Sequence, residues 1–245
     1  MTKPIRIGVL TPSSNTALEP LTSALAAEVS GCSAHFSRFT VTEIALSSRA
    51  LGQFDDANIL AAAALLADAK VDVIAWSGTA AGWMGFDSDR RLCDRIHART
   101  GIAATTAVLA LNELLKIARV ERLGLVTPYT QDVQQRIVEN YAREGIAVVA
   151  ERHLRISVNH DFALVEPDTL LDLMREVSLG TDHARPQAIS TYCTNLRAAP
   201  LAERVESELG IPLLDTVSTT VWGALRAVGA DPAQIKGWGS LFALR

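Results

Sequence analysis

The sequence predicts an α/β fold of two pseudo-symmetric, Rossmann-like domains with parallel sheets, and a cleft between them that holds the functional site. Three observations support this prediction. Short apolar runs rich in β-branched residues alternate with helical segments along all 245 residues, which is the pattern of parallel sheets covered by helices. Three segments of the first half recur in the second. Polar and small residues follow several strands at their carboxyl ends, where open α/β sheets bind ligands.

The recurring segments keep their order and nearly their spacing. GVLTP at residues 8–12 returns as GLVTP at residues 124–128, and VIAWSGT at 73–79 is matched by AISTYCT at 188–194. TGI at 100–102 is matched by LGI at 209–211. A period this long indicates duplicated domains and not a solenoid of short repeats. If the halves face each other, Gly78 lies opposite Cys193.

The length is comfortable for two domains of ordinary size. We expect a first half of residues 1–115 that is completed by a returning C-terminal segment, residues 217–245. Residues 116–216 form the second half, which carries Cys193.

In the first half, hydrophobic periodicity assigns strands and helices in alternation. Residues 12–16 form a turn whose serines and asparagine suit the N-cap of the following helix. The third strand is apolar at nearly every position, which indicates burial on both faces. The predicted strands are residues 5–11, 34–41, 71–76 and 102–104, and the predicted helices are residues 17–29, 58–69, 87–100 and 106–119.

The second half repeats this alternation. Gly145 ends its first helix as the residue after the C-cap. Residues 152–167 are the least regular stretch, and there His153, His160 and Asp161 could supply acid–base groups or simply be solvated. The predicted strands are residues 123–127, 147–150, 188–191 and 212–214, and the predicted helices are residues 131–144, 168–180, 199–209 and 215–228.

Composition excludes several functional classes. Hydrophobic residues make up 49%, charged residues 20%, and the net charge is −4, so neither nucleic acid nor a membrane surface is expected as the main partner. No apolar run is long enough to span a bilayer, and the N-terminus enters a strand with no signal-peptide core. Three cysteines without a CxxC or Cys/His cluster predict a cytoplasmic protein without a metal site.

Cys193 is the first candidate for chemistry, because it sits where a strand runs out into a loop. The competing interpretation is a small buried hydrophobe, which is the commonest role of a lone cysteine and the one we assign to Cys32 and Cys93. Residues 77–85 form a loop of glycines and small residues at another strand end, where a ligand could approach backbone N–H groups. This loop is neither GxGxxG nor a Walker A motif, so it gives little support to a nucleotide.

With these residues in view, the whole chain resembles the aspartate/glutamate racemase superfamily, and within it arylmalonate decarboxylase and maleate cis-trans isomerase. Racemases and isomerases of this superfamily carry two facing cysteines, one per half. Here the second is Cys193, whereas Gly78 stands at the first position. Arylmalonate decarboxylase has a similar arrangement, with Gly-Thr in the first half and one cysteine in the second. The resemblance therefore implies a cofactor-independent, single-cysteine decarboxylase that acts on a small dicarboxylate or aryl-dicarboxylate.

The resemblance also implies roles for individual residues. Cys193 would protonate the enediolate or carbanion left by carbon dioxide, and neighbouring donors would stabilise that intermediate as an oxyanion hole. The turn at residues 12–16 is similar to that of maleate isomerase, whose asparagine binds substrate, so Asn15 is carried over. Two positions depart from the decarboxylase, which has serine at Ala80 and glycines at 194–195. The expected substrate-binding residues are Ser14, Asn15, Gly78, Thr79, Ala80, Tyr129, Thr194 and Asn195.

Two further hypotheses remain open. A one-cysteine isomerase or racemase would need a second proton carrier, such as Tyr129 or a loop histidine. A small-acid binding protein would have lost catalysis together with the first cysteine. The sequence leaves open the exact substrate, the stereochemistry, and whether the chain forms a homo-oligomer.

Overall fold

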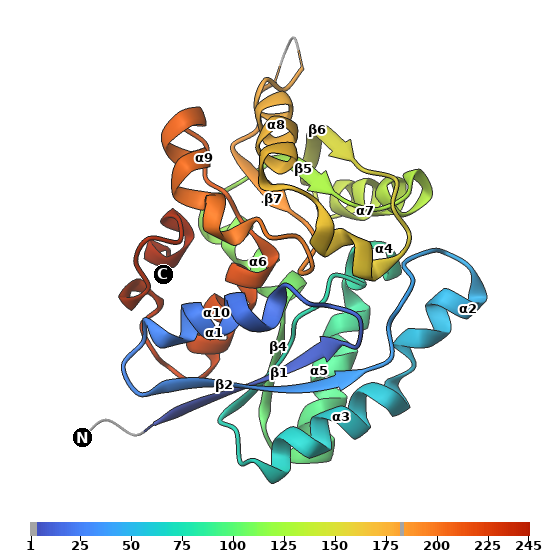
Figure 1. Cartoon of the computed structure of the whole chain (residues 1–245), viewed down its shortest axis with the longest axis vertical. Coiled ribbons are helices and arrows are strands. Elements are labelled where there is room, and N and C mark those ends of the chain that lie inside the picture. Colours follow the sequence, from blue (N-terminus) through green and yellow to red (C-terminus); the bar gives the residue numbers. More distant parts are fainter. Residues whose placement is uncertain (1–3, 182–183) are drawn as a thin grey trace.

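The computed structural model describes residues 4–181 and 184–245 and contains two separate parallel sheets (Figure 1). The first sheet has the order β2-β1-β3-β4 and the second has the order β6-β5-β7. The strands of the first are β1 (Ile5–Pro12), β2 (Cys32–Phe39), β3 (Val73–Trp76) and β4 (Ala103–Thr106). Those of the second are β5 (Arg122–Thr127), β6 (Ala147–His153) and β7 (Ala188–Thr191). The α/β class with parallel sheets is confirmed.

Helices connect consecutive strands, as parallel pairing requires. Those of the first half are α1 (Leu18–Ala27), α2 (Ser48–Leu51), α3 (Asp56–Asp68), α4 (Ala81–Met84), α5 (Asp87–Thr100) and α6 (Ala107–Ile117). After β5 come α7 (Gln131–Arg143), α8 (Pro167–Ser178), α9 (Ala202–Leu209) and α10 (Thr216–Ala227). Short 3₁₀ turns are η1 (Gly52–Phe54), η2 (Asn159–Leu164), η3 (Ala199–Leu201), η4 (Pro232–Gln234) and η5 (Ser240–Ala243).

The two sheets repeat one arrangement. β1 and β5 are each central, and Gly8 of β1 is aligned with Ile74 of β3 just as Gly124 of β5 is aligned with Ile189 of β7. Leu213 forms a single parallel bridge with Ile189, in the place that β4 takes beside β3. The repeated sequence motifs thus occupy equivalent positions in the two sheets.

The central glycines explain why the motifs recur. A β-carbon added to Gly8 would lie 2.8 Å from Cγ2 of Val71, and one added to Gly124 would lie 2.5 Å from Cγ1 of Val177. Both distances are too short for a real side chain, so each strand needs glycine where a neighbouring segment packs closely on it.

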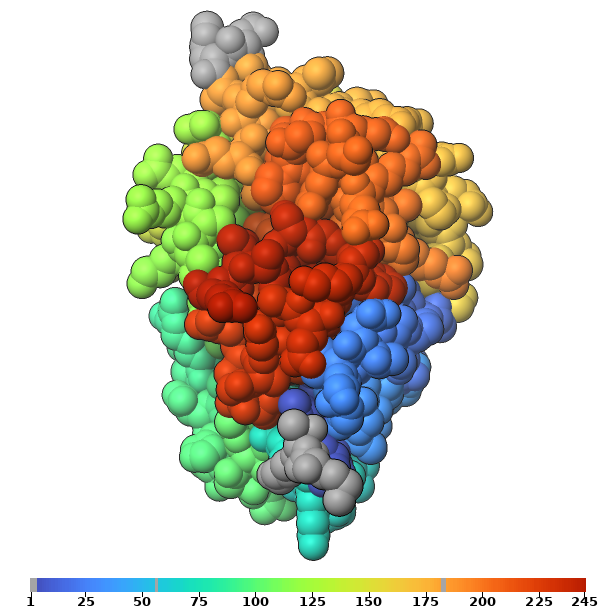
Figure 2. Space-filling view, turned by 90° about the vertical axis from the view of Figure 1, so that its left-hand side faces the viewer, coloured from blue at the N-terminus to red at the C-terminus, as the bar shows by residue number. Residues whose placement is uncertain are grey.

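α10 connects the two halves. Its N-cap Asp215 accepts hydrogen bonds from the N–H groups of Val217 and Ser218, at 2.9 and 3.1 Å. From there the helix packs against β3, β4, α1 and α6, all elements of the first half. Figure 2 shows the C-terminal residues in red between the blue N-terminal and the orange second-half surfaces.

Several elements differ from those predicted. Residues 212–214 form only the single bridge at Leu213, and residues 199–201 form a 3₁₀ turn before α9. β6 extends three residues beyond its predicted end. α2, α4 and the 3₁₀ turns were not predicted, because periodicity cannot identify helices of about one turn. No helix in the described residues is long and apolar enough to cross a membrane.

Candidate active site

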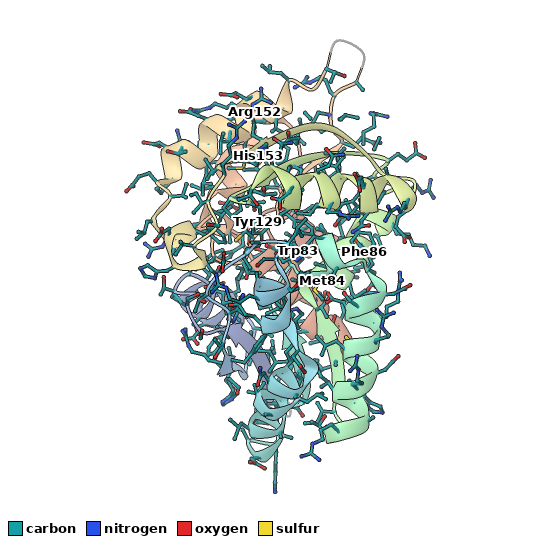
Figure 3. All side chains as sticks on the ribbon, turned by 90° about the vertical axis from the view of Figure 1, so that its right-hand side faces the viewer. Trp83, Met84, Phe86, Tyr129, Arg152 and His153 are labelled. Carbon is teal, nitrogen blue, oxygen red and sulfur yellow. The ribbon has the colours of Figure 1, made fainter. Side chains whose placement is uncertain are left out.

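A small internal cavity lies where β1, β3, β5 and β7 end. Its volume of about 20 Å³ is enough for about one water molecule. Cys193 lines it, and five of the other residues expected to bind substrate do so as well, namely Gly78, Thr79, Ala80, Tyr129 and Thr194. In Figure 3, Tyr129 and Trp83 lie side by side between the two parts of the molecule, while His153 lies further along the upper part.

Cys193 follows the end of β7 and is 3% exposed. Burial raises the pKa of its thiol to about 12, although hydrogen bonds from the Asn195 backbone and from Tyr129 act in the opposite direction. The N–H of Asn195 lies 3.4 Å from Sγ. The thiol is therefore protonated at neutral pH, which suits a proton donor and not an activated nucleophile.

Tyr129 and Thr79 bring donors from the two halves together. The Tyr129 hydroxyl lies 2.5 Å from Oγ1 of Thr79, and both side chains are buried. Burial raises the pKa of Tyr129 well above its usual value, so the phenol keeps its proton. Edge-to-face contacts with Trp83 and Phe162, at ring-centroid distances of 5.3 and 5.6 Å, hold the ring in place.

The space beside Gly78 is closed by an indole ring. A β-carbon added to Gly78 would lie 2.0 Å from Cζ2 of Trp76. Trp76 is 2% exposed and also packs on Phe39, at a ring-centroid distance of 5.0 Å. Position 78 of the cavity wall is therefore packed against an aromatic ring and has room for neither an acid nor a base.

Thr194 and Asn15 connect the loop after β7 to the loop after β1. Nδ2 of Asn15 donates to Oγ1 of Thr194 at 3.3 Å, and Thr194 donates to the carbonyl of Ser77 at 3.1 Å. Oδ1 of Asn15 accepts the N–H groups of Ala17 and Leu18 at the start of α1, both at 3.0 Å. Asn15 thus caps α1 and orients Thr194 at the same time.

Asn195 and Ser14 bond to protein groups. Oδ1 of Asn195 accepts the N–H groups of Thr16 and Ala17, at 3.0 and 3.2 Å, and its Nδ2 donates to the carbonyl of Asn159 at 2.5 Å. Ser14 donates to the carbonyl of Val41 at 2.6 Å and accepts from Nδ2 of Asn159 at 2.8 Å. Neither Ser14 nor Asn195 lines the cavity, nor does Asn15. In the structure these side chains position loops, so their direct roles in substrate binding stay predictions.

The cavity lining has no charged side chain, so an anion there would depend on neutral donors. Within the described residues, the backbone N–H groups of Thr79, Ala80 and Thr194 form no backbone hydrogen bonds. Such groups at strand ends favour anion binding. No group of three or more potential metal ligands occurs in the described part of the chain.

Sequence reasoning missed several lining residues, namely Trp76, Trp83, Phe54 and Asn159. Trp76 could have been found, because it is the last residue of a strand that ends at the site. Asn159 lies in the irregular stretch and carries no signal of its own. His153 bonds instead to Glu151, with 2.9 Å between its Nδ1 and Oε2, and neither His153, His160 nor Asp161 lines the cavity.

Comparison with protein families identifies this arrangement. The profile of the arylmalonate decarboxylase family matches residues 8–242. The chain belongs to the arylmalonate decarboxylase family. The resemblance to arylmalonate decarboxylase and maleate isomerase seen in the sequence is confirmed, because proteins of both names are among the relatives of this chain.

The relatives of this chain include a maleate isomerase and an arylmalonate decarboxylase. Maleate isomerase of Pseudomonas putida is 27% identical over 253 residues, which cover 98% of each chain. Arylmalonate decarboxylase of Bordetella bronchiseptica is 30% identical over 144 residues, or 58% of this chain and 59% of that protein. Among solved structures, maleate isomerase from Pseudomonas putida S16 matches with a TM-score of 0.88 and 25% identity, over 98% of each chain. An arylmalonate decarboxylase crystal structure matches with a TM-score of 0.78 and 22% identity, over 98% of this chain and 100% of that one, which supports the shared fold.

Proposed function

We propose that the protein is a cofactor-independent decarboxylase of a small dicarboxylic acid, with Cys193 as its proton donor. One observation carries the proposal: the cavity is lined by a single thiol, which is buried and protonated, while Gly78, where the resemblance places a second thiol, packs against the indole of Trp76. Chemistry that needs an acid or a nucleophile on both faces has no second group there. Protonation from a single face requires only Cys193.

The hydrogen-bond donors of the cavity determine where each substrate carboxylate binds, and therefore which of the two leaves. One substrate carboxylate binds the Tyr129 and Thr79 hydroxyls and the backbone N–H groups of Ala80 and Thr194. The second carboxylate lies against apolar walls such as Val41 and Ile44 and leaves as carbon dioxide when its carbon–carbon bond breaks. The bonding electrons pass into the first carboxylate as an enediolate, which the donors stabilise.

Cys193 completes the reaction. Its S–H bond breaks as the proton moves to the α-carbon, which gives a monocarboxylic acid and a thiolate. The thiolate recovers a proton from water after product release. Because its pKa lies far above neutral pH, reprotonation is strongly favoured.

A second candidate is an isomerase of maleate-type acids, which the 27% identity to a maleate isomerase across the whole chain favours. Cys193 would then act as a nucleophile or acid without a facing cysteine. One assay separates the two activities. Purified protein is incubated separately with methylmalonate, phenylmalonate and maleate, and carbon dioxide and fumarate are measured. Carbon dioxide from a malonate supports the proposal, whereas fumarate without carbon dioxide contradicts it.

The same ligands test the remaining hypothesis, that the protein binds small acids without catalysing a reaction. It would bind the acids, seen as a rise in melting temperature, and would release neither product.

A further inference from the structure

A second cavity lies next to the first. Its volume is about 40 Å³, and Phe54, Trp76 and Ala80 line both cavities. The remaining walls include Leu92, which is apolar, and Asp89, which is an acid. The two cavities are therefore neighbours, with Trp76 as a shared wall.

Two polar residues line the second cavity: Ser88, whose hydroxyl donates to the carbonyl of Gly85 at 2.7 Å, and Asp89. Asp89 is only 2% exposed, and its Oδ2 has no hydrogen-bond partner in the described structure. Burial raises the pKa of this carboxyl to about 7, although a hydrogen bond with Thr106 lowers it. An unpaired buried carboxyl oxygen is costly for a protein to keep.

Helix stabilisation does not account for this burial. Asp89 lies in the first turn of α5, where an acid interacts favourably with the helix dipole, but Asp87 lies in the same turn. The side chain of Asp87 is 72% exposed, so it can serve the dipole without the cost of desolvation. A purely structural Asp89 would also be expected to have both oxygens bonded.

We propose that the second cavity is a subsite for the far end of the substrate side chain, where Oδ2 of Asp89 accepts a hydrogen bond from a hydroxyl or ammonium group. This inference rests on the proposed function, because it places the two carboxylates beside Cys193. Between the two ends lie the apolar side chains of Phe54, Trp76 and Leu92. The substrate class is a dicarboxylic acid with an apolar side chain that ends in a hydrogen-bond donor.

In its ionised form, Asp89 disfavours other ends. A substrate with a third carboxylate there would meet a like charge in a low-dielectric site, which is strongly unfavourable. A methyl end would leave Oδ2 unpaired, and sites built to bond a polar group reject analogues that lack it.

Substrate entry requires the cavities to widen. Together they hold only a few water molecules. Met84 lines the second cavity and is 42% exposed, and Figure 3 places it near Trp83. Methionine is unbranched and adapts readily to a new neighbour, so movement of Met84 gives the second cavity access to solvent.

The test compares two malonates of nearly equal shape, 4-hydroxybutylmalonate and pentylmalonate, with unsubstituted malonate as a third ligand. Affinities are measured by calorimetry in the full chain carrying Cys193→Ala, which blocks turnover. We expect the hydroxyl-ended acid to bind roughly tenfold more tightly than the methyl-ended acid. Asp89→Leu should abolish or reverse this preference. Asp94→Leu, the same change at an exposed position of α5, should preserve it.

Each outcome decides the question. Equal affinities for the two substituted acids would overturn the inference without any variant, even if Asp89→Leu failed to fold. A preference that survives Asp89→Leu would also overturn it and would leave Asp89 bonded to water only. Binding of malonate without discrimination keeps the proposed function and removes only the subsite. If none of the three acids binds, the proposed function and this inference both fall.

Discussion

The indole of Trp76 fills the space into which any side chain at Gly78 would extend, since a β-carbon there would lie 2.0 Å from Cζ2 and 2.4 Å from Cε2. The absence of a thiol at position 78 is thus reinforced by packing. Residue 78 cannot regain a side chain unless the ring moves. Trp76 and Gly78 form a coupled pair, so the effects of substituting them on stability should be strongly non-additive.

We expect Gly78→Cys alone to lose stability by roughly 1–3 kcal/mol and to lose activity, because it overpacks the site. It should still give product of a single hand. Adding Trp76→Leu makes room for the new thiol, and this double variant should protonate both faces and give the opposite hand or a racemate. Chiral chromatography of the product checks this, with Trp76→Leu alone as control. A racemate from Gly78→Cys alone would show that the ring moves freely.

Cys193→Ala should lower turnover by roughly 10²–10⁴-fold, the usual contribution of a positioned proton donor. Binding of the dicarboxylate should change little, since the hydroxyls of Tyr129 and Thr79 remain. Steady-state kinetics and calorimetry on the same preparation separate the two effects. Cys93→Ala removes a cysteine of α5 that does not line the cavity and should leave turnover unchanged. Full activity in Cys193→Ala would mean that another group carries the proton.

Alkylation of Cys193 should be slow at neutral pH. Burial raises the pKa of the thiol to about 12, and only the thiolate reacts. The rate should therefore rise about tenfold per pH unit from pH 7 as far as the fold survives. Mass spectrometry of iodoacetamide-treated protein gives the rate at each cysteine, and half-buried Cys32 is an internal comparison. Rapid labelling of Cys193 at pH 7 would contradict the protonated state.

Tyr129→Phe should weaken carboxylate binding by roughly tenfold, because it removes a buried donor that bonds Thr79 at 2.5 Å. The effect should appear in KM as well as in kcat, since the hydroxyl bonds the bound acid and the enediolate. Tyr141→Phe is the matched control, because this buried tyrosine donates to Asn112 away from the cavity. If both variants lose activity equally, the loss comes from the fold and not from Tyr129.

The pH dependence of stability should report on Asp89. The folded protein raises the pKa of this carboxyl from 3.8 to about 7, so it binds the proton more tightly than the unfolded chain does. The stabilisation from Asp89 is therefore complete below about pH 4 and is lost as the pH rises through about 7, by up to about 4 kcal/mol. Asp89→Asn should accordingly gain stability relative to the native chain across this window. Urea unfolding at pH 5 and pH 8 measures the difference, and exposed Asp94→Asn should show none. A stability difference between the native chain and Asp89→Asn that is the same at pH 5 and pH 8 would mean that the fold does not raise the pKa of Asp89.

Local patterns predicted the strand ends, and therefore the positions of Gly78, Thr79, Tyr129 and Cys193 around one site. These positions depend on the order of elements and on burial, both of which periodicity records. The repeated GVLTP-type motifs also predicted that the sheets repeat, because glycine is required where another segment packs closely on β1 and β5.

The roles of individual polar side chains were less predictable. Asn195 bonds Thr16 and Asn159, residues that are distant in sequence, and no local signal reveals such partners. The place of Trp76 at a strand end could be predicted, but the direction in which its ring turns over Gly78 depends on packing around the whole site. Asp89 lies in the first turn of α5, where acids are common, and only its burial beside a cavity distinguishes it.

The path of α10 also has a consequence for synthesis on the ribosome. This helix packs on β3 and β4, yet it is translated after the whole second half. The first sheet therefore emerges early and waits, with apolar surface uncovered, until residues beyond 216 leave the exit tunnel. Nascent chains in this state are prone to aggregate and are typical clients of chaperones. Chains that stop before α10 should be recovered as insoluble protein.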